Sequence, residues 1–160
     1  MTKEIKRNQW SKFFKKFSAD NRFRQINVSV KQNDNYDDWK TFEIPFMGLM
    51  LEKNGRLIDG VQLLSGWWDG DQVARPLYSF KNPDKILLEK NDEGDDWRLK
   101  LWTKDGIEAS IELNGIRNPG WVVEKVAYSL YERRGYQHGQ DMGDWYEAER
   151  RVKEAEAAMV

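Results

Sequence analysis

Hydrophobic residues near the start of the chain repeat with the period of an α-helix. Large apolar side chains recur at intervals of three and four residues, at Trp10, Phe13, Phe14 and Phe17, and this spacing places them on one helical face. Lysines fill much of the rest of the segment. A helix of this kind buries its apolar face and keeps its charged face in water, so we expect an amphipathic helix that packs on a sheet.

The hydrophobic period then shortens to two residues, which is typical of half-buried strands. Segments with this pattern follow one another between short turns, at residues 24–31, 42–52, 56–64, 73–80, 86–89, 97–103 and 107–113. Between two of them, Asn54-Gly55 predicts a type I′ hairpin turn, in which both central residues have positive φ. Strands joined by short turns pair antiparallel. We therefore expect a twisted, mainly antiparallel sheet of about six or seven strands, which could curl toward a barrel.

A helical pattern returns after a turn-rich segment at residues 114–120. The last helix carries an apolar seam at intervals of three and four residues, made of Trp145, Ala148, Val152, Ala155 and Met159. A short loop before this helix favours an antiparallel helical hairpin. The sequence thus predicts an α+β fold with a sheet domain at residues 1–116 and a C-terminal helical hairpin at residues 117–160. The last helix is longer than the helix it is expected to pair with, so we expect its end to rest on the body or on another protein.

Composition excludes several kinds of chemistry. The chain has no cysteine and one histidine, which rules out disulfides, thiolate metal sites, cysteine nucleophiles and multi-histidine metal sites. No cofactor motif is present. The first residues lack the uninterrupted apolar core of a signal peptide, and no run is long enough to span a membrane as a helix. These features predict a cytoplasmic protein.

Two parts of the chain resemble uncharacterised bacterial families. The C-terminal motifs are Ala127-Tyr128-x-Leu130-Tyr131-Glu132-x-Arg134-Gly135, His138-Gly139-x-Asp141 and Trp145-x-x-Ala148-Glu149. They resemble a short helical-hairpin module of unknown function over residues 120–158. Residues 1–116 resemble a second such family, through Trp10-Ser11-x-Phe13-Phe14, Gly70-Asp71-Gln72-Val73 and the strand at residues 86–89. The resemblance implies a bacterial protein of two modules, and it implies no catalytic residue.

Tryptophans are the most notable candidates for binding. Trp67 and Trp68 are adjacent, so in a strand one ring would be buried while the other faced solvent or a ligand; packing of both beneath a loop is the alternative. Trp102 lies on the polar side of its strand and could extend an exposed aromatic patch. His138 could act as a base, but we expect it to fasten the interhelical turn with Asp141, Trp145 and Glu149. The acidic runs at residues 69–71 and 92–96 are expected to be solvated turns.

Three functions are compatible with these patterns. The first is a non-catalytic interaction or accessory protein that docks on a larger bacterial assembly. Its contact residues would be Trp67, Trp68, Trp102, His138 and the hairpin positions Trp145, Val152, Ala155 and Met159. The second is a small-ligand or carbohydrate-binding module with a tryptophan stacking platform. The third, an acid–base hydrolase, has no identifiable catalytic pair. We expect a protein partner rather than nucleic acid, and self-association is left open.

Overall fold

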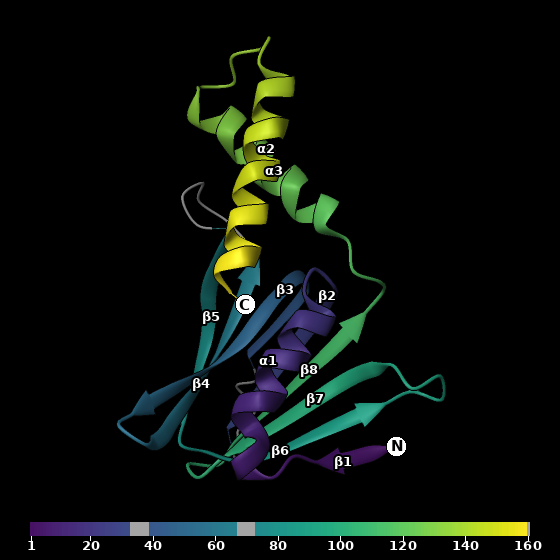
Figure 1. Cartoon of the computed structure of the whole chain (residues 1–160), viewed down its shortest axis with the longest axis vertical. Coiled ribbons are helices and arrows are strands. Elements are labelled where there is room, and N and C mark those ends of the chain that lie inside the picture. The colour runs from purple at the N-terminus through teal and green to yellow at the C-terminus, as the bar shows by residue number, and fades with distance from the viewer. Residues whose placement is uncertain (33–38, 67–72, 160) are drawn as a thin grey trace.

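The computed structural model describes residues 1–32, 39–66 and 73–159, with the side chain of Trp39 excepted. The strands are β1 (Thr2–Glu4), β2 (Gln25–Gln32), β3 (Trp39–Asn54), β4 (Leu57–Gly66), β5 (Ala74–Lys81), β6 (Pro83–Lys90), β7 (Asp96–Thr103) and β8 (Ile107–Asn114). The helices are a 3₁₀ turn (Arg7–Gln9), α1 (Trp10–Asn21), α2 (Pro119–Arg133) and α3 (Asp141–Ala158). Figure 1 shows α1 lying across one face of the sheet and the α2–α3 pair projecting beyond one end of it.

The predicted α+β class and antiparallel pairing are confirmed. The sheet has eight strands in the order β1-β6-β7-β8-β2-β3-β4-β5, and each neighbouring pair is antiparallel. The predicted number of six or seven is too low by one or two, and the strand absent from the seven predicted segments is β1. The sheet is also not closed: β1 and β5 form its two edges, so the predicted curl does not reach a barrel.

The curl nevertheless brings the two halves of the sheet together at one end. A single residue, Asn82, connects β5 to β6, although these strands lie far apart in the sheet order. Arg7 donates hydrogen bonds from Nη1 to the Pro83 carbonyl oxygen at 3.1 Å and from Nη2 to that of Ile58 at 3.0 Å. These contacts link β6 to β4 at this end of the sheet.

The long strand β3 carries the bend between the two halves. Its first part pairs with β2 as far as Pro45, and its second part pairs with β4 from Phe46 onward. Glu43 has a positive φ of 54°, and the register shifts between Phe46 and Gly48. Such irregularities bend a strand and increase its twist. Past the bend, β3 lies against α1, where the Leu49 amide donates a hydrogen bond to the Ser18 hydroxyl.

The hairpin between β3 and β4 forms, but not with the predicted turn. Asn54 pairs with Leu57, so the central residues of the turn are Gly55 and Arg56. Positive φ occurs only at Gly55, at 63°, which is the pattern of a type II′ turn rather than type I′. The glycine still supplies the left-handed conformation, one position earlier in the turn than expected.

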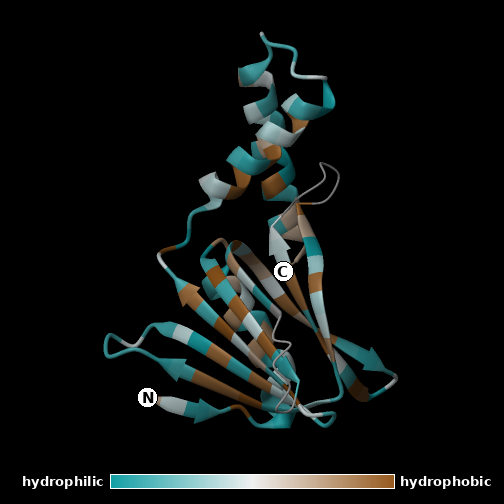
Figure 2. Cartoon of the chain, turned by 180° about the vertical axis from the view of Figure 1, so that it is seen from behind, coloured by the Kyte–Doolittle hydropathy of each residue, from teal (hydrophilic) through white to brown (hydrophobic). Residues whose placement is uncertain are grey.

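Two hydrophobic clusters stabilise the molecule. The larger one lies between α1 and the sheet and contains Trp10, Phe14 and Phe17. The second joins the helical pair to the body, and its members are Phe23, Met47, Leu64, Val73, Val122, Val123, Val126, Ala148 and Val152. Figure 2 shows apolar positions along the strands alternating with polar ones and apolar positions along both C-terminal helices. The helical pair is therefore fixed on the body by packing of its own.

Candidate binding groove and hairpin surface

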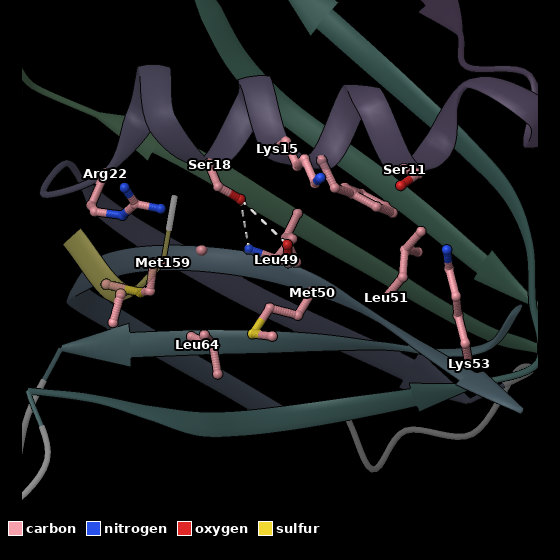
Figure 3. A pocket seen from close by; sticks show the side chains of 13 residues that line it. Ser11, Lys15, Ser18, Arg22, Leu49, Met50, Leu51, Lys53, Leu64 and Met159 are labelled. Atoms are coloured by element: carbon pink, nitrogen blue, oxygen red, sulfur yellow. Dashed lines mark hydrogen bonds between the residues drawn. The ribbon is translucent and has the colours of Figure 1, made fainter. Parts of the chain in front are cut away.

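A groove runs between α1 and the β3–β4 half of the sheet (Figure 3). Its volume is about 430 Å³, and the end of α3 contributes to its wall through Ala158 and Met159. The other apolar walls come from Phe14, Leu49, Met50, Leu51 and Leu64. Clefts of this size and apolar character are typical of sites for small molecules.

The polar residues of the groove come chiefly from one face of α1. The groove is lined by Ser11, Lys15, Ser18 and Arg22. Their spacing of four, three and four residues places the first three on one face of α1, and Arg22, which directly follows the helix, continues that face. The buried aromatic side chains of α1 lie beside this stripe and face the sheet. The amphipathic helix thus presents a third type of face, polar and directed into the groove.

Arg22 is the unusual member of this stripe. Only 3% of the residue is exposed, and its Nε donates a hydrogen bond to the Met47 carbonyl oxygen at 2.8 Å. Within the described parts of the chain, neither Nη atom has a hydrogen bond and no carboxylate forms an ion pair with the guanidinium. Burial lowers the pKa of Arg22, Glu156 opposes that effect and Arg117 adds to it. A buried cation without an ionic partner is costly.

Ser18 and Gly48 shape the groove next to this guanidinium. The Ser18 hydroxyl accepts a hydrogen bond from the Leu49 amide at 2.9 Å, and this bond ties α1 to β3. Gly48 has no side chain to fill the adjacent space. A methyl group at Gly48 would lie 3.5 Å from Ser18 Oγ and 3.9 Å from Arg22 Nη2. The space beside Arg22 Nη2 is therefore large enough for at least one added heavy atom.

A second candidate surface lies on the helical pair. Four of the five exposed aromatic side chains in the described ranges belong to residues 119–159: Tyr128, Tyr136, Trp145 and Tyr146. We name these four, together with exposed Met142, the hairpin aromatic surface. Tyr131 lies among several of the rings, with its centroid 6.1 Å from that of Tyr128 and 5.3 Å from that of Tyr136.

The structure separates the candidate residues that the sequence indicated. Trp67 and Trp68 lie outside the described residues. Trp102 is half-buried on β7, where the Lys85 ammonium lies 5.5 Å from its ring. In the hairpin, Trp145 is exposed, whereas Val152 is buried and Ala155 and Met159 pack on the second hydrophobic cluster. The end of α3 thus rests on the body.

His138 does not have the contacts expected of it. Its Nε2 lies 3.4 Å from the Tyr131 hydroxyl, while the Trp145 indole instead donates to Glu149. The interhelical connection is held by Arg134, whose two Nη atoms bond both carboxylate oxygens of Asp144. The histidine ring packs on Tyr131, and in the described residues no hydrogen bond joins it to Asp141, Trp145 or Glu149; its role in fastening the turn stays a prediction.

The acidic run at residues 92–96 is only partly a solvated turn. Asp96 accepts a hydrogen bond from Asn21 Nδ2 at 2.9 Å and pairs with Lys90 at 3.1 Å, so it anchors the end of α1 to β7. The residues at 69–71 lie outside the described part. In the ranges that the structure describes, no three histidine, aspartate or glutamate side chains are grouped to hold a metal ion.

Sequence reasoning missed Arg22 and the groove. Ser11, Lys15, Ser18 and Arg22 recur at helical spacing in the sequence, but a polar stripe of this kind is also typical of the solvated side of an amphipathic helix. The sequence could not reveal that β3 bends toward this side.

Among the described helices, none is long and apolar enough to cross a membrane.

Comparison with known proteins bears on the C-terminal part of the chain. No curated protein matches the chain, and no solved structure matches it. The expectation of an uncharacterised domain in the C-terminal part is confirmed, because residues 123–154, from α2 into α3, match a family described as "Protein of unknown function (DUF2934)".

Proposed function

We propose that this chain is a non-catalytic interaction protein and that it docks on a protein partner through the hairpin aromatic surface. The observation that carries the proposal is the concentration of exposed rings on α2, α3 and their connection. Tyr128 is 57% exposed, Tyr136 56% and Tyr146 60%. Tyrosine, tryptophan and methionine are enriched in protein interfaces, where their rings provide much of the binding energy.

The framework beneath these rings supports the proposal because it is well fixed. Val126, Ala148 and Val152 bury the inner sides of the two helices against the body, and Arg134 joins the helices through Asp144. A surface held in place in this way loses little conformational entropy on binding. The part of the seam formed by Val152, Ala155 and Met159 already packs within the chain, so the proposed contact lies on the outer, aromatic side.

Site-specific crosslinking tests this function. A photoreactive amino acid replaces Tyr128 in the full chain, expressed in the cells that produce the protein, and crosslinked proteins are identified by mass spectrometry. The partner is then purified and titrated with Tyr128→Gln/Tyr146→Gln. Glutamine favours helix, so the fold should persist. We expect the dissociation constant to rise about tenfold or more, as for loss of interface anchors.

The control is Phe42→Thr, which removes an equally exposed ring from β3, where Phe42 is 65% exposed. It should leave the affinity unchanged. Equal binding by the hairpin variant and the unaltered chain would overturn the proposal. So would crosslinks formed only with a second copy of this chain.

A further inference from the structure

We infer that the groove between α1 and the β3–β4 half of the sheet is a binding site for a small amphipathic carboxylate, such as a medium-chain fatty acid, with its head group on Arg22 and its apolar part along Leu49 and Leu51. This site lies apart from the hairpin aromatic surface. Each proposal can therefore fail without the other.

The charge of Arg22 indicates the head group. Its bond from Nε to Met47 fixes the plane of the guanidinium and leaves both Nη atoms without a hydrogen bond in the described residues, with Nη2 beside the open space at Gly48. A guanidinium with two free donors matches a carboxylate, which can accept two parallel hydrogen bonds. Glu156, the acidic residue that acts on Arg22 electrostatically, is already paired with Arg117 at 3.1 Å. An incoming carboxylate would supply the missing ionic partner.

The residues that line the rest of the groove indicate that the remainder of the ligand is apolar. Beyond Arg22 the floor and walls are side chains of Phe14, Leu49, Leu51 and Leu64, and Ser18 has its hydroxyl engaged with the Leu49 backbone. These groups offer an aliphatic chain apolar contact and few competing polar partners. Lys15 and Lys53 line the groove as exposed residues, and lysines in such positions cover apolar surface with their stems while the ammonium groups stay in water.

The shape of the groove fits one molecule of this class. Figure 3 shows Arg22 and Met159 at one end, Leu51 and Lys53 at the other, and Ser18 and Leu49 between them. The cation and the apolar walls therefore follow one another along the groove. A ligand with a charged head and an aliphatic tail matches this order of a charged end followed by an apolar part. A sugar or a nucleotide would instead bring hydroxyl groups against the leucines.

Calorimetric titration of the full chain with sodium decanoate, below its micelle concentration, tests the inference. Acetate carries the head alone and decanol the tail alone, so both should bind at least about tenfold more weakly than decanoate. Octanoate and dodecanoate establish how affinity depends on the length of the tail. Equal affinity for decanol and decanoate would overturn the role of Arg22. Absence of decanoate binding at millimolar concentration would overturn the site itself.

Two variants locate the ligand. Arg22→Gln removes the charge, and Gly48→Ala places a methyl group at ordinary contact distances from Ser18 and Arg22, in the space assigned to the head group. Both should raise the dissociation constant for decanoate about tenfold. Gly143→Ala is the matched control, since the space around this helical glycine is open to a methyl group and it lies outside the groove. Should Arg22→Gln fail to fold, unchanged decanoate binding by Gly48→Ala would still overturn the inference.

Discussion

Arg134 and Asp144 form a two-pronged ion pair that joins the end of α2 to the first turn of α3. Arg134 Nη2 donates to Asp144 Oδ2 at 2.7 Å, and Nη1 donates to Oδ1. Asp144 is buried, and hydrogen bonding to its carboxylate raises the pKa of Arg134. Paired planar groups of this kind are stronger and more directional than single hydrogen bonds. The pair therefore determines how the two helices meet.

Asp144→Asn should loosen this connection. The amide keeps the shape of the side chain but leaves the partly buried guanidinium without its charge partner, at a cost of about 1–3 kcal/mol. Amide hydrogen exchange along α2 and α3 measures the local effect, and urea denaturation measures the global one. Asp92→Asn, in an exposed turn, is the control. Equal exchange rates in the two variants would contradict the prediction.

At Phe23, substitution by glycine should destabilise the protein less than substitution by alanine, which is the reverse of the usual order. Its ring is 1% exposed in the second hydrophobic cluster, and its φ is 73°. Phe23→Ala loses the buried ring, which costs about 3–5 kcal/mol, and retains the strained backbone. Phe23→Gly loses the same ring but removes the strain, so it should be more stable than the alanine variant by about 1 kcal/mol. Urea denaturation of both variants tests this order, and a less stable glycine variant would refute it.

Gly66 should not tolerate a side chain. A Cβ atom at this position would lie 2.6 Å from Cγ and 2.8 Å from Cβ of Pro45, and the proline ring cannot rotate away. Gly66→Ala should therefore destabilise the protein by roughly 1–3 kcal/mol. A double-mutant cycle with Pro45→Gly, which removes both clashing atoms, measures the coupling. If the clash is the cause, Gly66→Ala lowers the free energy of unfolding by less in the Pro45→Gly background; an unchanged cost would assign the effect elsewhere.

The regular strands could be predicted because their local pattern and their burial agree. Ile26, Val28 and Val30 alternate with polar residues, and all three are buried in β2. The strand β1 could not be predicted in this way. Thr2, Lys3 and Glu4 are all exposed, so the strand owes its existence to pairing with β6 at the sheet edge rather than to an apolar face.

The groove was beyond prediction for a related reason. It depends on the bend of β3 near Glu43 and Pro45 and on the end of α3 reaching the sheet, and both are long-range features. The sequence identified the seam that ends in Met159 and indicated that its end needed a surface to rest on. It did not indicate that this surface adjoins Arg22, because a charged residue at the end of an amphipathic helix is normally solvated.

Acid should weaken the last helix through Glu147. Hydrogen bonds from Arg150 and Arg151 lower the pKa of this carboxyl from 4.5 to about 2. Between these values the unfolded chain binds more protons than the folded one, so stability is complete above about pH 4.5 and is lost as the pH falls toward about 2. Glu147→Gln should therefore be less stable than the unaltered chain at neutral pH, and the difference should shrink near pH 3. Because these groups are exposed, the difference should also shrink in high salt.

Urea midpoints at both pH values measure the effect, with Glu93→Gln, in an exposed turn, as the control. A difference between Glu147→Gln and the unaltered chain that persists at low pH would show that the charge of Glu147 is not its source.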